Sequence, residues 1–147
     1  MLTPEERLEQ LEGVFEELET LSERGPIIVE GKKDAQALAS LGVKKNIVTL
    51  SKGLSVFAFC ERIARMSSSA VVLTDWDRKG GTLARMLRDG LATNGVLVNE
   101  NIRAQLAVLS KKEIKDIEGI PRFVLRLRKL AGIERRRPPL AKLRQKD

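Results

Sequence analysis

The sequence predicts an α/β fold in which helices cover both faces of a doubly wound, parallel sheet of about four strands. Short apolar runs without polar alternation, which are typical of strands buried on both faces, alternate along the chain with helix-length amphipathic segments. An amphipathic helix precedes the first apolar run, and a helical, basic extension follows the last one. The 147 residues are enough for one domain with a substantial core.

The N-terminal helix has clear start and stop signals. Thr3 and Glu6 form a Thr-x-x-Glu capping box around Pro4, which occupies the favoured first helical position. Apolar residues then recur at steps of three and four, as expected for one buried stripe: Leu8, Leu11, Val14 or Phe15, Leu18 and Leu21. Gly25 and Pro26 end this helix, and we expect the stripe to pack on the rest of the domain.

The central part alternates between strands and helices. The expected strands are residues 27–29, 46–50, 70–73 and 96–98, and the expected helices between them are 32–41, 54–66 and 78–94. Beyond residue 99 we expect two helical pieces separated at 119–121, and an extended end from the Arg-Arg-Arg-Pro-Pro run at 135–139. This divides the chain into an N-terminal helix (1–25), a central domain (26–110) and a helical extension with a basic tail (111–147).

The residue types that are missing limit the chemistry. The chain has no His, no Tyr and one Cys, which excludes a Ser-His-Asp triad, a Cys-His dyad and a structural zinc site. It also excludes a tyrosine nucleophile from this chain. Carboxylates, Lys, Arg, hydroxyls and backbone amides remain, and carboxylates favour hard cations such as Mg²⁺.

The charge is distributed unevenly. Residues 1–25 carry a net charge of −6, residues 26–121 carry +5 and residues 122–147 carry +8. A basic C-terminal segment predicts an anionic partner, nucleic acid first, although solubility alone can also explain such a charge run. A single Cys and the absence of an apolar run of about 20 residues predict a cytoplasmic protein with no membrane partner.

Acidic residues follow two of the expected strands. Glu30 comes directly after the first strand, and Asp75 and Asp77 come shortly after the third. The carboxyl ends of parallel strands form the usual ligand-binding edge of an open sheet. On an extended backbone, two residues two positions apart point to the same side, with Cα atoms about 6–7 Å apart. The three carboxylates are therefore predicted to converge on one or two divalent ions.

Four cations stand beside these acids: Lys32, Lys33, Arg78 and Lys79. Metal ions need the carboxylates, whereas phosphate oxygens bind cations and the unpaired amides at helix starts. The pattern therefore predicts a combined metal and phosphate site. Residues Arg135, Arg136 and Arg137 in the tail are further candidates for binding the nucleic-acid backbone.

Two segments resemble the signature motifs of the Toprim domain. These are the segment PIIVEGKKDA at residues 26–35 and the segment VVLTDWDRKGG at residues 71–81. Gly53, after the second strand, fits the glycine often found there. The resemblance covers about residues 24–100, and overall the chain is similar to the small stand-alone Toprim proteins of archaea. Toprim domains also occur in primases, topoisomerases, OLD-family nucleases and ribosomal-RNA maturases.

The resemblance implies roles for the matching residues. Glu30 would act as general acid or base and contribute to metal binding, while Asp75 and Asp77 would hold Mg²⁺, for which Mn²⁺ could substitute. Without a Tyr or a zinc module, a topoisomerase or a complete primase is not expected. The function expected is phosphodiester cleavage or phosphotransfer on RNA or DNA, in RNA processing, repair or replication, with protein partners in those processes.

Two alternatives stay open. A non-catalytic RNA- or ribosome-binding module could keep the metal site for positioning. A phosphatase of the haloacid-dehalogenase type also carries an Asp-x-Asp motif, but on its first strand rather than its third. Among single residues, Cys60 is expected to be a core thiol and Asp34 a partner of its helix N-terminus rather than a metal ligand. Trp76 could stack on a base or pack inside the motif loop.

Overall fold

The computed structural model describes residues 1–50, 52–110 and 113–132, and the elements are those of an α/β protein. In chain order they are α1 (Pro4–Ser22), β1 (Ile27–Val29), α2 (Lys32–Ser40), β2 (Ile47–Thr49), α3 (Val56–Met66), β3 (Ser69–Val72), α4 (Arg78–Thr93), β4 (Leu97–Asn99), α5 (Asn101–Ser110) and α6 (Ile120–Ala131). The predicted alternation of strands and helices is confirmed. The predicted extended end at 135–139 lies outside the described residues.

The four strands form one parallel sheet in the order β2-β1-β3-β4. Ile27 of β1 pairs with Ile47 of β2 on one side and with Val71 of β3 on the other, so β1 and β3 are the central strands. β4 pairs with β3 and forms one edge of the sheet. The predicted fold class, a doubly wound parallel sheet of four strands, is therefore confirmed.

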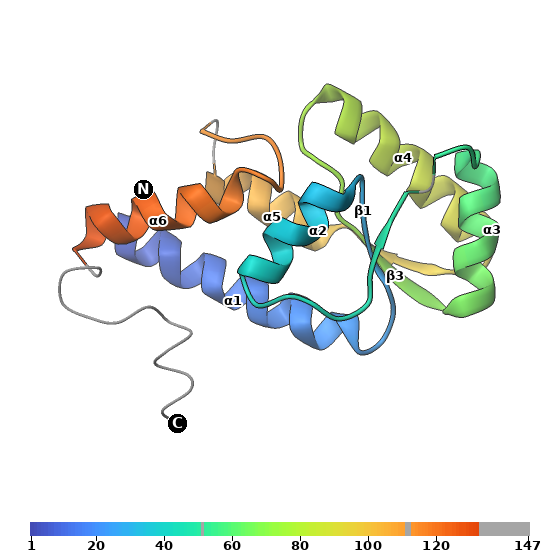
Figure 1. Ribbon diagram of the computed structural model, residues 1–147, viewed down its shortest axis with the longest axis horizontal. Helices are drawn as coiled ribbons and strands as arrows, with labels where there is room; N and C mark the ends of the chain where they lie inside the picture. Colours follow the sequence, from blue (N-terminus) through green and yellow to red (C-terminus); the bar gives the residue numbers. More distant parts are fainter. Residues whose placement is uncertain (51, 111–112, 133–147) are drawn as a thin grey trace.

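Each face of the sheet has its own hydrophobic core. On one face, Ile27, Val29 and Val71 pack with residues of α1, α2, α5 and α6. On the other face, Ile28 and Val72 pack with residues of α3 and α4. The alternation of side chains along β1 and β3 explains this division, because successive residues of a strand point to opposite faces. Figure 1 shows α3 and α4 together at one end of the molecule and α1, α5 and α6 at the other.

The N-terminal helix α1 forms as its sequence predicts. The Thr3 hydroxyl accepts a hydrogen bond from Glu6 N at 3.1 Å, and the Glu6 carboxylate accepts one from Thr3 N at 2.9 Å. The helix packs on α5 and α6, and in Figure 1 α1 and α6 run side by side in opposite directions. Its buried stripe consists of Leu8, Leu11, Val14, Phe15 and Leu18.

Local differences from the predicted boundaries have simple causes. Helix α3 begins at Val56 rather than residue 54, because the Ser55 hydroxyl caps it by accepting from Ala58 N at 3.0 Å. Strand β4 begins one residue later than expected.

Cys60 is fully buried in the core between the sheet and α4, as predicted for a core thiol. None of the helices among the described residues has the length and apolar character needed to cross a membrane.

Candidate active site at the carboxyl edge of the sheet

The candidate site lies where the two central strands end. Glu30 directly follows β1, and Asp75 follows β3 by three residues. The Glu30 carboxylate accepts a hydrogen bond from the backbone N–H of Asp75, with 2.8 Å between Oε2 and N. Because β1 and β3 are parallel neighbours, their carboxyl ends bring together two residues that are 45 positions apart in the sequence.

Asp77 has a different role from Asp75. It is the N-cap of α4, and its Oδ1 accepts a hydrogen bond from Gly80 N at 2.7 Å. Its side chain is exposed, whereas Asp75 is half-buried. Among residues 1–50, 52–110 and 113–132, no three acidic or Cys side chains are grouped as a ready-made metal site. The convergence of Glu30, Asp75 and Asp77 on a metal ion therefore stays a prediction.

A glycine allows α4 to start close to the aspartate loop. A Cβ atom on Gly80 would lie 1.8 Å from the carbonyl oxygen of Asp75, so no side chain fits at this position. The buried Thr74 hydroxyl donates a 2.8 Å hydrogen bond to the carbonyl of Gly80 and closes the same turn. Gly80 thus fixes the backbone that carries both aspartates, a role that the motif resemblance alone did not assign to it.

Arg103 of α5 holds the same backbone from the other side. Its guanidinium donates to the carbonyl of Thr74 at 3.1 Å through Nε and to the carbonyl of Asp75 at 2.9 Å through Nη2. The positively charged Arg103 side chain is thus hydrogen-bonded to backbone carbonyls at the site. Sequence analysis missed Arg103, because nothing near it in the sequence marks it as a partner of a loop 28 residues earlier.

The loop between α5 and α6 closes over the aspartates. Ile117 N donates to Asp75 Oδ1 at 3.0 Å, and Trp76 N donates to the carbonyl of Lys115 at 2.8 Å. The Trp76 indole N–H donates to the carbonyl of Ile114 at 2.9 Å and to the Ser110 hydroxyl at 3.2 Å. Trp76 therefore packs inside the motif loop and anchors the α5–α6 loop, which was one of its two predicted roles.

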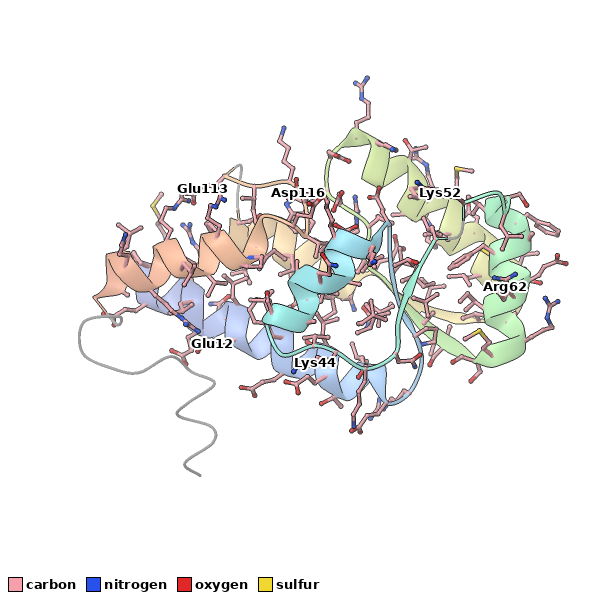
Figure 2. All side chains as sticks on the ribbon, viewed as in Figure 1. Glu12, Lys44, Lys52, Arg62, Glu113 and Asp116 are labelled. Atoms are coloured by element: carbon pink, nitrogen blue, oxygen red, sulfur yellow. The ribbon has the colours of Figure 1, made fainter. Side chains whose placement is uncertain are left out.

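That loop adds two acids that sequence analysis did not single out, Asp116 and Glu118. The Asp116 carboxylate accepts from Gly119 N at 2.8 Å and, in Figure 2, lies near the start of α2. Both acids act electrostatically on Asp34, whose carboxylate accepts from Gly31 N at 3.0 Å at the start of α2. The predicted role of Asp34 at its helix N-terminus is thus confirmed, and it also belongs to a wider group of acids.

Burial and like charges shift the pKa values in this group. Burial raises the pKa of Asp75 to about 7, and the nearby carboxylates of Glu30, Asp34 and Asp116 add to the rise, although the Ile117 amide opposes it. Burial likewise raises the pKa of Asp34, with smaller contributions from Glu118 and Glu30. A carboxylate surrounded by other carboxylates resists ionisation unless a cation compensates the charge.

The predicted phosphate-binding cations lie at helix starts. Lys32 and Lys33 begin α2, directly after Glu30, and Arg78 and Lys79 begin α4, directly after Asp77. All four side chains are exposed. Helix N-termini and cations together favour anions such as phosphate, so the role of these four residues in phosphate binding stays a prediction that their positions allow. Arg135, Arg136 and Arg137 lie outside the described residues.

Comparisons with known proteins agree with this geometry. The family model of the Toprim domain matches residues 25–109. A UPF0292 protein of Methanosarcina barkeri is 42% identical over 86% of this chain and 88% of its own, and one of Methanocaldococcus jannaschii is 33% identical over 82% and 94%. A solved structure of a protein from Aquifex aeolicus superposes with a TM-score of 0.61 at 29% identity, covering 72% of this chain and 94% of that chain. The chain belongs to the Toprim domain family and is homologous to the small archaeal UPF0292 proteins.

Proposed function

We propose that this Toprim protein acts on nucleic acid with the help of Mg²⁺, by phosphodiester cleavage or phosphotransfer. The observation that supports this function best is the contact of the Glu30 carboxylate with the Asp75 backbone at the carboxyl ends of two adjacent central strands. A group able to take a proton thus lies directly beside a half-buried carboxylate suited to a cation. Phosphoryl chemistry at neutral pH needs both kinds of group.

The residues at the site fit a hard divalent cation. The donors are carboxylate oxygens, and the half-buried carboxylate Asp75 has a pKa raised by burial and by neighbouring carboxylates, a repulsion that a cation would relieve. Glu30, Asp75 and Asp77 each use one carboxylate oxygen for a backbone hydrogen bond. These three residues would hold one or two Mg²⁺ or Mn²⁺ ions. When bound, Mg²⁺ neutralises charge on the reacting phosphate.

The chain's own groups supply the other functions. The Glu30 carboxylate orients the attacking water or hydroxyl and accepts its proton, because it is fixed by the Asp75 amide through one oxygen only. Lys32, Lys33, Arg78 and Lys79 bind phosphate oxygens beside the amides of their helix starts. Arg103 and Gly80 keep the backbone between Thr74 and Asp77 in place.

One observation favours a second candidate, a non-catalytic nucleic-acid-binding module. Each of the three predicted metal ligands already accepts a backbone hydrogen bond, from Asp75, Ile117 and Gly80 respectively. Such contacts also stabilise a carboxylate in a purely structural role. The two candidates differ in whether the protein breaks a phosphodiester bond.

The deciding experiment compares Glu30→Gln with wild type on labelled RNA and DNA in Mg²⁺, Mn²⁺ or EDTA. The amide can still accept the Asp75 N–H bond but cannot take a proton. We expect metal-dependent cleavage by wild type, and a rate at least about 100-fold lower for Glu30→Gln, with binding changed less than about twofold. Glu61→Gln, at an exposed position on α3, is the matched control and should cleave like wild type.

Three results would count against this proposal. Cleavage by Glu30→Gln at the wild-type rate would show that Glu30 takes no part in the reaction. Cleavage that persists in EDTA would show that the reaction does not need a divalent metal. If wild type binds nucleic acid but cleaves none of the substrates with either metal, the binding module becomes the better description.

A further inference from the structure

The outward face of α6 carries a row of cations. Arg122, Arg126 and Lys129 follow one another at steps of four and three residues, and all three are exposed. Steps of three and four place side chains on the same side of a helix. The opposite side of α6 is buried against the core through Ile120, Phe123, Val124, Leu127 and Ala131. We call Arg122, Arg126 and Lys129 the α6 stripe.

The α6 stripe is only partly neutralised by acids of the protein. Arg126 forms an ion pair with Glu113, which also pairs with Arg7 at 2.9 Å. The Arg126 side chain is still 51% exposed, and exposed ion pairs of this kind exchange readily with other anions. Among the residues that the structure describes, no carboxylate lies within ion-pair distance of Arg122 or Lys129. Helix α6 itself contains no acidic residue.

Along the chain, the α6 stripe begins shortly after a residue of the candidate site. Helix α6 follows directly on the loop in which Ile117 donates to Asp75, and Arg122 is five residues beyond Ile117. Helix α2, which begins with Lys32 and Lys33, packs against α6. In Figure 1, α6 leads from the neighbourhood of α2 towards the far end of the molecule. Helix α6 therefore carries its exposed cations from the neighbourhood of α2 towards that end.

We propose that the α6 stripe binds the phosphate backbone of the nucleic acid that enters the carboxylate site. This proposal rests on the proposed function, since it assigns a binding surface to the same substrate. From Arg122 to Lys129 the stripe spans about 10 Å of helix, and each strand of a duplex has one phosphate for about every 3.4 Å of axis. Three cations thus face about three consecutive phosphates of one strand.

The surroundings of α6 favour nucleic acid over an anionic membrane. A helix that lies on a membrane uses a continuous apolar face to enter the lipid, but most large apolar residues of α6 are buried in the core, and only Leu125 and Leu130 are exposed beside the stripe. The neighbouring helix α1 carries exposed acids, among them Glu5, Glu9 and Glu17, which repel a polyanion. These acids disfavour a polyanion on the surface of α1 next to α6.

The test is a charge-removing variant, Arg122→Gln with Arg126→Gln and Lys129→Gln, in the full chain. Glutamine keeps part of the aliphatic stem and removes the charge. The matched control removes the same charge from α3 and α4, through Arg62→Gln, Arg65→Gln and Arg85→Gln. All three control positions are exposed, and Figure 2 shows Arg62 at the end of the molecule opposite α6.

Binding is measured by fluorescence anisotropy with single-stranded RNA and DNA of about 20 nucleotides, in EDTA, over a range of salt concentrations. We expect the stripe variant to bind at least about tenfold more weakly, with a salt slope shallower by up to about two units, because each phosphate contact with a single strand contributes about 0.7. The control should lose affinity by less than about threefold. Both variants should keep the wild-type melting temperature.

Several outcomes would overturn the proposal. One is an equal loss of affinity in the stripe variant and the control. Another is a stripe variant with the wild-type salt slope. The third is a stripe variant that loses binding to vesicles of anionic phospholipid but binds RNA and DNA like wild type. The single variants Arg122→Gln and Lys129→Gln, which leave the Glu113 ion pair intact, give the same test if the triple variant melts early. Cleavage assays separate the two proposals: wild type that binds through the stripe but never cleaves contradicts the proposed function alone.

Discussion

Asp75 is a half-buried carboxylate among other carboxylates, and this gives the protein a measurable pH dependence. Its pKa is raised from 3.8 to about 7, so the folded state holds a proton that the unfolded state has already lost between these two values. Stability should therefore fall as pH rises from about 4 to about 7 and then level off. Asp34, whose pKa is also raised, contributes in the same direction.

The variant Asp75→Asn tests this in the absence of divalent metal. Asparagine can still accept the Ile117 N–H bond but has no charge to lose. We expect its melting temperature to fall less than that of wild type between pH 5 and pH 8, with the variant the more stable of the two at pH 8. Asp89→Asn, at an exposed position of α4, should keep the wild-type profile. An identical pH profile for Asp75→Asn and wild type would contradict the raised pKa.

At the scale of single residues, the site was predictable in part. Glu30 and Asp75 could be placed together because each follows a buried strand, and parallel strands end at one edge. For Asp77, a shared side with Asp75 stays a prediction from its spacing. The extended backbone that predicts a shared side ends at this residue, since α4 begins at Arg78 and the Asp77 carboxylate turns towards the amide of Gly80.

At the scale of elements, the α5–α6 loop depends on Trp76. The indole N–H bonds to the Ile114 carbonyl and the Ser110 hydroxyl, and the same loop supplies the Ile117 amide to Asp75. Trp76→Phe keeps an aromatic ring and removes both indole bonds. We expect a loss of stability of about 1–2 kcal/mol and faster amide hydrogen exchange at Ile117.

Hydrogen exchange followed by NMR or mass spectrometry checks this expectation, with Leu73 as the internal reference. The Leu73 amide bonds to the carbonyl of Ile28 inside the sheet and should exchange at the wild-type rate. Unchanged protection at Ile117 would show that the loop is held by the burial of Ile117 itself and of the adjoining Ile120 of α6, rather than by the indole.

The same loop shows why some elements cannot be predicted from the sequence. Helices such as α1 and strands such as β1 were predictable because apolar periodicity and capping residues are local signals. The segment 113–119 has no such period. Its bonds reach Asp75 and Trp76, about 40 positions earlier, so its place in the site depends on the packing of α5 and α6 and not on its own sequence.

At the scale of the whole molecule, opposite charges are separated along the chain and belong to different helices. The acidic residues of the first 25 positions belong mainly to α1, whereas α6 and the segment after it are basic. Since α1 and α6 pack side by side, a polyanion meets an attractive surface next to a repulsive one. If the protein binds nucleic acid as proposed, such an arrangement would orient it before any sequence-specific contact forms.

Deleting residues 135–147 tests whether the basic end contributes to this orientation. The deletion removes the six cations Arg135, Arg136, Arg137, Lys142, Arg144 and Lys146 and one acid, Asp147. If these cations bind phosphates, affinity should fall for every nucleic-acid sequence, and the salt slope should become shallower by up to about 0.9 for each lost contact with duplex DNA. The melting temperature should stay close to wild type, because the helices of both cores, including α6, end before residue 135. A shortened protein that keeps the full salt slope would show that the tail only adds solubility, and the cations at the starts of α2 and α4, together with α6, would then account for the whole electrostatic contribution to binding.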